Sequence, residues 1–262
     1  KDAEGNKYQY GKLIWAADLK TLYRVTNTEG LQKDIIHKIE VRKEELLTRH
    51  GTDSVFILYL AVDEQPEFFK EISHGHFFYT PSRQGLGETH RGELKHLLNN
   101  WPDVTKVELY DWLDRFLKLN TYEISIPVLK EPHAAPQGKT GLIISLLFDY
   151  NLVKKVSQSG WYEEFKGETE RRMLDILSET VFPGLNQKVM FKFSATPLSI
   201  EDTVGSSDGS IVGWSFSEPI PVPSNLLKIS QASKTVIPNV LIVRQWTYSP
   251  SWVPKAHLTR RL

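Results

Sequence analysis

The sequence contains no cysteine, which excludes disulfides, thiolate catalysis and cysteine metal sites. The 262 residues also lack an apolar run of the ~18 residues that a membrane-spanning helix needs. Because 32 basic residues balance 32 acidic ones, no net charge favours nucleic acid or an anionic membrane surface as a partner. No HExxH, GxSxG, phosphate-binding P-loop or EF-hand pattern is present, and GxGxxG is absent as well.

The chain also shows no signal peptide and no initiator Met. We therefore interpret it as starting inside a longer protein, with a mature or tagged N-terminus as the alternative. Hydrophobic residues make up 40% and charged residues 24%, which is ordinary for a globular protein. We expect a cytoplasmic protein.

Apolar periodicity predicts strands and helices in mixed order. Strand-like runs lie at 12–16, 54–62, 76–80, 122–129, 141–149, 189–195 and 240–243. Helical spacing predicts a helix after an N-cap at Asp18, helices at 35–47, 66–72, 89–99, 104–119 and 161–180, and a short one opened by a capping box at 199–202. The interleaving predicts an α+β fold, a mixed β-sheet with helices packed on it.

Two segments are candidate sites on residue chemistry alone. His74 and His76 would share a face on a strand, but no third ligand accompanies them, so a solvated loop pair is favoured and no metal site is predicted. Residues 248–254 combine two prolines and two aromatics directly after a predicted strand. They form either a rigid cap on the sheet edge or a loop lining a ligand cleft, since ligand sites in open sheets lie beyond the carboxyl ends of strands.

Four segments carry recognisable motifs. They are Gly11–Asp18 (GKLIWAAD), residues 122–139 ending in APQGK, residues 182–213 with PGL, TP and a glycine-rich loop, and residues 237–254 with QWT and VP. In this order they resemble the C-terminal half of the phytoene desaturase, carotenoid isomerase and retinol saturase family of FAD-dependent oxidoreductases. The first segment is similar to the family's strand that returns to the flavin domain, and the last to its closing strand and flavin-facing loop.

The resemblance implies that residues 1–262 form the substrate-side domain of a longer flavoprotein, similar to the substrate domain of flavin amine-oxidase-like proteins. Its FAD would act on carbon–carbon bonds of an apolar polyene, carotenoid- or retinoid-like. Its partners would be that substrate and the missing FAD-binding part of its own chain, with a peripheral membrane contact and no nucleic acid. The residues assigned to the flavin are Gln245, Trp246, Thr247, Val253 and Pro254.

The same resemblance leaves the catalytic residues unassigned, because the chemistry belongs mainly to the flavin. Without the glycine-rich turn that binds the pyrophosphate, this chain alone is expected to hold no FAD and to be inactive. With the flavin domain absent, Trp246 or Trp252 should be more exposed than a core Trp usually is.

Three departures from the family's pattern support an alternative. Arg244 stands where the family has Gly, Trp252 lies in the place of a glycine-rich turn, and Arg260 interrupts the closing motif. Glycine lets the backbone approach a flavin closely, and these larger side chains would crowd that approach. The alternative is a non-catalytic homologue that binds an apolar ligand or a protein partner.

Overall fold

The computed structural model describes residues 4–51, 53–87, 89–214, 231–243 and 246. The chain divides into two compact units, and each is described by itself. Unit 1 comprises Lys1–Asp53 and Ile200–Leu262, and unit 2 comprises Ser54–Ser199. Of the described residues, 48% are helical and 19% lie in strands, with helices packed on sheets, which confirms the predicted α+β class.

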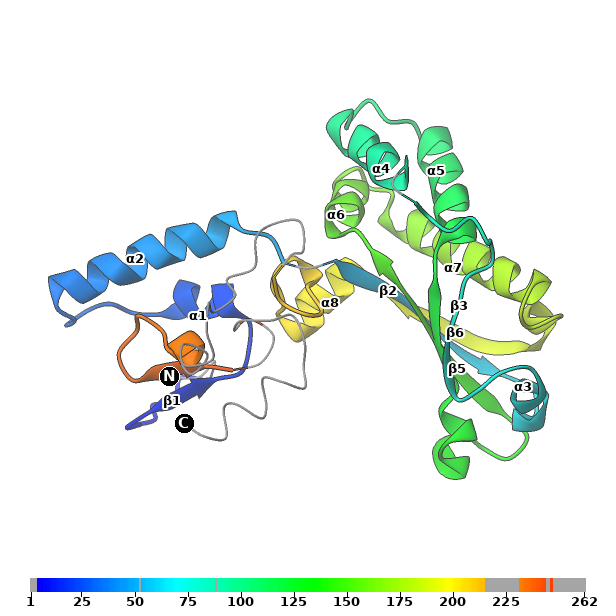
Figure 1. The fold of residues 1–262 in the computed structure, drawn as a ribbon, viewed down its shortest axis with the longest axis horizontal. Coiled ribbons are helices and arrows are strands. Elements are labelled where there is room, and N and C mark those ends of the chain that lie inside the picture. Colours follow the sequence, from blue (N-terminus) through cyan, green and yellow to red (C-terminus); the bar gives the residue numbers. More distant parts are fainter. Residues whose placement is uncertain (1–3, 52, 88, 215–230, 244–245, 247–262) are drawn as a thin grey trace. The chain divides into compact units, whose positions relative to one another are not determined.

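Unit 2 contains most of the regular structure (Figure 1). Its strands are β2 (Ser54–Val62), β3 (His76–Tyr79), β4 (Tyr122–Ser125), β5 (Thr140–Phe148) and β6 (Val189–Ala195). Its helices are α3 (Pro66–Ile72), α4 (Thr89–Asn99), α5 (Lys106–Leu119), α6 (Tyr150–Gln158) and α7 (Tyr162–Glu179), with short 3-10 turns at Pro127–Leu129, Pro132–Ala134 and Leu185–Lys188. Helix α8 (Pro197–Val204) carries the chain from unit 2 back into unit 1.

The five strands of unit 2 form one antiparallel sheet in the order β3-β4-β5-β2-β6. The central strand β2 pairs along its whole length with β5, from Ser54 opposite Phe148 to Val62 opposite Thr140. Alternate residues of β2 are buried, as expected where one face of a sheet meets the core. Helices α4 to α7 gather on one side of these strands in Figure 1.

The core of unit 2 lies between the sheet and its helices. Phe56 and Leu58 of β2 are fully buried there, together with Trp112 of α5, Val153 of α6 and Met173 of α7. Burial of one apolar stripe per helix is the usual driving force of such packing, at about 25 cal/mol per Å². Within the described residues of unit 2, the side chains on the opposite face of the sheet are exposed or half-buried.

Two elements differ from the sequence prediction in where they begin or end. Strand β4 ends at Ser125 rather than continuing to 129, because Pro127 has no N–H for a ladder and begins a 3-10 turn. Helix α8 begins at Pro197, and its reciprocal cap is Thr196 with Ser199 rather than a box opened at Ser199. Ser199 N donates to Thr196 Oγ1 at 3.3 Å, and Thr196 N donates to Ser199 Oγ at 3.1 Å.

One helix was not predicted. Helix α6 follows β5 directly, and Asp149 caps it by accepting the N–H of Leu152 at 2.7 Å. The sequence prediction assigned Asp149 to the end of the strand and so missed its role as an N-cap.

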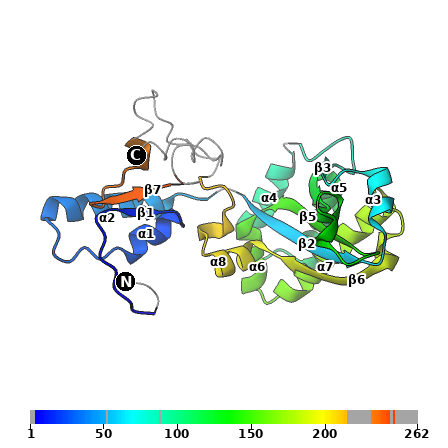
Figure 2. The same ribbon diagram turned by 90° about the horizontal axis from the view of Figure 1, so that it is seen from below.

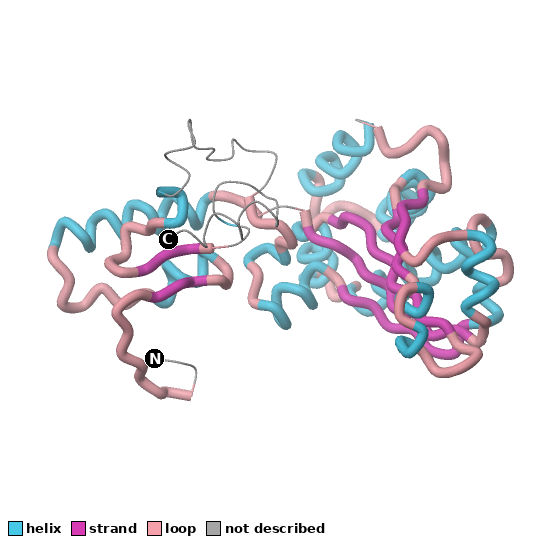
Figure 3. The backbone as a smooth tube through the Cα atoms, turned by 60° about the horizontal axis from the view of Figure 1, so that its bottom comes forward, coloured by secondary structure: helices cyan, strands magenta, loops and turns pink. Residues whose placement is uncertain are grey.

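Unit 1 is built on a two-stranded parallel sheet, visible at the side of α1 and α2 in Figure 2. Strand β1 (Leu13–Trp15) pairs with β7 (Val240–Ile242), so that segments from the two ends of the sequence lie side by side, as the tube in Figure 3 also shows. Helices α1 (Leu19–Val25) and α2 (Lys33–Thr48) belong to the same unit. The buried cluster comprises Leu19, Leu22, Tyr23, Ile39, Leu46, Trp214, Ile237, Val240, Ile242 and Trp246.

A buried polar network joins the segments of unit 1. Asp18 caps α1 by accepting the N–H of Thr21 at 2.8 Å, as predicted for this residue. The same carboxylate accepts the backbone N–H of Ser207 at 3.0 Å and its hydroxyl at 2.8 Å. One side chain thus serves both the first helix of the chain and the 3-10 turn at Ser207–Gly209.

Asp208 makes the second connection. It lies in the left-handed region with φ 60° and accepts from buried Lys20 at 2.9 Å and from Gly51 N at 3.1 Å. Gly51 lies close to where the chain leaves unit 1, and an added Cβ there would lie only 2.6 Å from Cβ of Ser210. The segment where the chain leaves unit 1 is therefore hydrogen-bonded directly to the segment that follows its return.

We expect Asp208→Asn to destabilise the fold by about 1 kcal/mol at neutral pH, and this difference to vanish in acid. Burial raises the pKa of Asp208, but the hydrogen bond from Lys20 and the N–H of Gly51 together hold that pKa below its ordinary value of 3.8. A depressed folded-state pKa contributes stability that is present above about pH 4 and is lost as the pH falls through the folded-state value. Asn keeps an oxygen for Gly51 and tolerates positive φ, so the variant removes mainly the charge.

Urea unfolding of both proteins from about pH 3 to about pH 7 measures this difference. Asp34→Asn is the matched control, because the Asp34 carboxylate is exposed in the first turn of α2 and pairs with exposed Lys38 at 3.6 Å. A difference between Asp208→Asn and the parent that persisted unchanged to the lowest pH would contradict the role given to the charge.

Candidate functional site

The five-stranded sheet of unit 2 has one face that its helices leave open. Paired residues of neighbouring strands share a face, so the register identifies its members. The open face consists of His76, Phe78, Glu123, Ser125, Gly141, Ile143, Ser145, Leu147, Val55, Ile57, Tyr59, Ala61, Phe191, Phe193 and Ala195. All of these side chains are exposed or half-buried.

The larger part of the open face is apolar and lies over β5, β2 and β6. Tyr59 stacks on Phe193 with ring centroids 4.5 Å apart and an interplanar angle of 7°. Phe191 and Phe193 are 60% and 50% exposed, and Leu147 on β5 is 53% exposed. These exposed apolar side chains make the open face a candidate surface for binding another apolar group.

A polar group occupies the β3–β4 side of the same face. His76 Nε2 lies 2.8 Å from Glu123 Oε1, and Ser145 Oγ donates to Glu123 Oε2 at 3.4 Å. Phe78 packs its ring edge-on against His76 at 5.6 Å and is 67% exposed. Glu123 is the one carboxylate among the residues of the open face. The face therefore combines a large apolar area with one group of hydrogen-bonding side chains at the β3–β4 side.

This arrangement can bind a long apolar molecule along the strands and hold a polar end against Glu123 and His76. The sequence prediction did not identify this site. The sequence feature that could have revealed the open face is the run from Val55 to Ala61. This run is apolar on both faces of the strand, although an antiparallel sheet usually has one polar face.

The two histidines weighed as a metal pair do not come together on one strand. His76 begins β3 and pairs with Glu123, whereas His74 precedes the strand and lines a groove with Pro66, Lys70 and other residues. Among the described residues, no group of three or more His, Asp and Glu side chains could hold a metal ion.

Of the residues assigned to the flavin, only Trp246 is described. Gln245, Thr247, Val253 and Pro254 lie outside the described residues. Trp246 was expected, with Trp252 as the other candidate, to be unusually exposed, and for Trp246 this is wrong because only 2% of it is exposed. It fills the core of unit 1 beside Trp214, and Trp252 also lies outside the described residues.

The Trp214–Trp246 pair is the centre of that core. The rings meet edge-to-face at 5.1 Å and 89°, and Trp214 Nε1 donates to the backbone oxygen of Trp246 at 3.0 Å. The guanidinium of Arg49 lies 4.4 Å from the Trp214 ring centroid. The indole N–H of Trp246 is buried and has no acceptor among the described residues, although a buried donor is normally paired.

A search for membrane-spanning helices and comparisons with known proteins identify no further feature. No helix within the described ranges is both long enough and apolar enough to cross a bilayer. No protein-family model matches the chain, and no curated protein matches it either.

We expect Trp214→Phe to destabilise unit 1 by about 1 kcal/mol more than Trp246→Phe does. Both changes remove the same indole volume, but only the first breaks a hydrogen bond and leaves the Trp246 carbonyl without its donor. Urea unfolding measures the free energy of unfolding of both variants, and each variant serves as the control for the other. A larger loss in Trp246→Phe would show that its N–H has a partner that stabilises the fold.

Proposed function

We propose that this chain is the substrate-side part of an FAD-dependent oxidoreductase that acts on carbon–carbon bonds of an apolar polyene, carotenoid- or retinoid-like. The observation that carries the proposal is the parallel pairing of β1 with β7. These are the first and last of the segments that resemble the family, and the whole of unit 2 lies between them in the sequence. The resemblance assigns both strands to the flavin side, and their pairing agrees with that assignment.

The parallel sheet of unit 1, which has two strands among the described residues, also supports a further partner. Parallel sheets usually have more strands and are covered on both faces. Here the face opposite α1 and α2 carries Ile14, which is 63% exposed. We propose that the FAD-binding part of the same parent chain adds strands and a covering layer to β1 and β7.

When bound, FAD would accept or donate the electrons that change the order of a carbon–carbon bond. The residues of this chain would position the substrate and the ring. Trp246 offers a buried N–H without an acceptor among the described residues, and the ring oxygens and nitrogens of a flavin are acceptors of the required kind. Gln245, Thr247, Val253 and Pro254 are proposed to continue this contact.

The open face is proposed as the wall along which the polyene lies. Its stacked rings, Tyr59 and Phe193, and the aliphatic side chains of β5 match a long, flat, apolar molecule. The corner formed by His76, Glu123 and Ser145 would hold a polar end of the substrate or exchange a proton with it. A peripheral membrane contact, from which an apolar substrate could enter, belongs to the same proposal.

The alternative is a non-catalytic homologue that uses the same face for an apolar ligand or a protein partner. It is favoured by Arg244, Trp252 and Arg260, which occupy positions where the family approaches the flavin with glycine or small residues. Flavin absorption of the purified longer protein separates the two, since only the enzyme requires bound FAD.

We expect an apolar polyene to bind the open face of this chain. The probe is 1,6-diphenylhexatriene, whose fluorescence rises when it leaves water. The double variant Tyr59→Ser/Phe193→Ser removes the stacked rings and should weaken binding at least about tenfold. Both side chains are partly exposed, so the variant should still fold.

The matched control is Tyr8→Ser/Tyr10→Ser, which removes two exposed aromatic rings from unit 1 and should leave the affinity unchanged. Equal affinity of the open-face variant and the parent would exclude this face as the binding surface.

For the flavin, we expect Arg244→Gly/Trp252→Gly in the longer protein to change the affinity for FAD or its absorption, because both side chains would crowd the approach that the family makes with glycine. FAD titrated into the 262-residue chain alone should not bind, since no glycine-rich turn is present for the pyrophosphate. Identical flavin titrations of the double variant and its parent would favour the rigid-cap interpretation of residues 248–254.

A further inference from the structure

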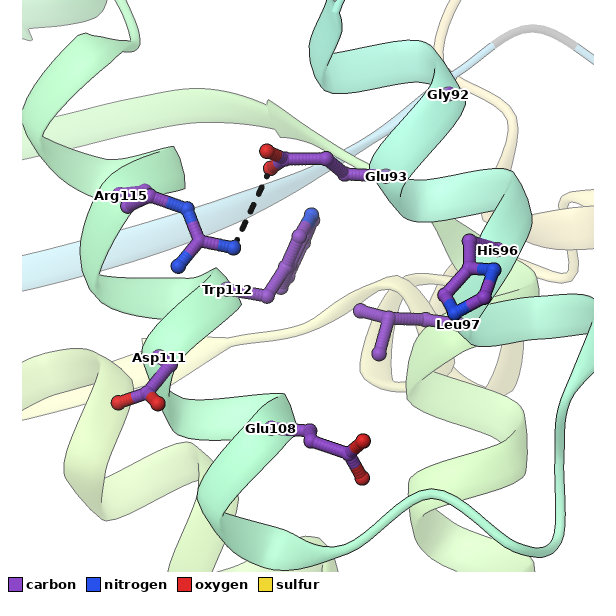
Figure 4. A pocket seen from close by; sticks show the side chains of 8 residues that line it. All are labelled: Gly92, Glu93, His96, Leu97, Glu108, Asp111, Trp112 and Arg115. Atoms are coloured by element: carbon purple, nitrogen blue, oxygen red, sulfur yellow. Dashed lines mark ion pairs between the residues drawn. The ribbon is translucent and has the colours of Figure 1, made fainter.

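A separate pocket lies between α4 and α5, on the helical side of unit 2. Its volume is about 640 Å³, which lies within the range of small-molecule sites. Figure 4 shows that α4 and α5 contribute facing side chains. The lining residues are Gly92, Glu93, His96, Leu97, Glu108, Asp111, Trp112 and Arg115.

Trp112 contributes the unusual feature of this pocket. Only 2% of the residue is exposed, and its ring stacks on Phe116 at 4.8 Å and on His90 at 5.3 Å. Burial lowers the pKa of His90, so its imidazole stacks as an uncharged ring at neutral pH. The indole N–H of Trp112 has no hydrogen-bond partner among the described residues, although a buried donor is normally paired.

The indole nitrogen of Trp112 lies on the side of the pocket that faces α4 (Figure 4). In Figure 4 the indole lies between the two helices with its nitrogen end toward α4, where Glu93 and Leu97 lie. The Glu93 side chain is partly exposed and pairs with Arg115 at 3.5 Å, a surface ion pair of the kind that contributes little. A ligand can therefore bring an acceptor to the nitrogen beside Glu93, which keeps its pair with Arg115.

The charges around the pocket restrict that acceptor. Glu93, Glu108 and Asp111 are acidic, and Arg115 is the one residue of fixed positive charge in the lining. The positive charge of Arg115 is paired with Glu93, whereas Asp111 has no salt bridge among the described residues. The excess of carboxylates disfavours an anion such as a fatty acid, whereas an uncharged oxygen meets no such repulsion.

We propose that this pocket binds an uncharged, largely apolar carbonyl compound whose oxygen accepts the indole N–H of Trp112. The apolar body of the ligand lies against Leu97 and the gap left by Gly92, where an added Cβ would meet nothing within 4 Å. The site does not depend on the flavin or on the open face, because α5 packs on the opposite side of the sheet.

The test uses the full chain with 15N-labelled tryptophan and follows the indole N–H signals during titration. Three probes of similar size are compared, namely acetophenone, ethylbenzene and benzoate. We expect a saturable downfield shift of the Trp112 N–H proton with acetophenone, and binding about three- to tenfold tighter than that of ethylbenzene, which has no acceptor. Benzoate should bind more weakly than acetophenone.

Two variants fix the location. Trp112→Phe identifies the signal by removing it, and Gly92→Phe places a ring in the pocket and should abolish binding of acetophenone. Gly167→Phe is the matched control, because Gly167 is also helical and also has free space around an added Cβ. If Trp112→Phe fails to fold, the shift caused by Gly92→Phe identifies the same signal.

The proposal is overturned if acetophenone and ethylbenzene bind equally well, if benzoate binds most tightly, or if Gly92→Phe binds acetophenone as the parent does.

Discussion

Two aspartates join the parts of unit 1 that lie before and after unit 2 in the sequence. Asp18 joins the start of α1 to the turn at Ser207–Gly209, and Asp208 joins that turn to Lys20 and to Gly51. Because the chain leaves the unit next to Gly51 and returns before Ser207, these hydrogen bonds close the unit around the insertion of unit 2. Asp18 and Lys20 are buried and Asp208 is half-buried, so an arrangement without these hydrogen bonds would leave buried polar groups unpaired.

The two faces of the unit 2 sheet have different surroundings. Even-numbered residues of β2, such as Phe56 and Leu58, meet the helices and provide stability, whereas Tyr59 and its neighbours lie on the other face. The helices therefore need not move for the open face to accept a ligand. The single acidic group of that face, Glu123, gives an otherwise apolar surface a direction, because a molecule with one polar end fits it in one orientation.

Local patterns predicted most of the fold, and distant contacts were beyond them. The strand at 54–62, indicated by its β-branched and aromatic residues, and the Asp18 cap were both correctly predicted, because each depends on neighbouring residues. The partner of Tyr59 on β6 and the group formed by His76, Glu123 and Ser145 depend on strand order, which periodicity does not encode. Trp246 was misplaced for a related reason: its exposure is set by Trp214, 32 positions away, rather than by its own loop.

The pairing of β1 with β7 has a consequence for the order in which a growing chain can fold. Leu13 cannot pair until Val240 has been synthesised. Lys20 likewise cannot form its ion pair until Asp208, 188 positions later in the sequence, has been synthesised. Unit 2 contains all of its own strands, so it can fold on the ribosome while the N-terminal segment still has no partner. Until Val240 has been synthesised, the apolar side chains of β1 and α1 therefore lack the residues that bury them in the complete unit.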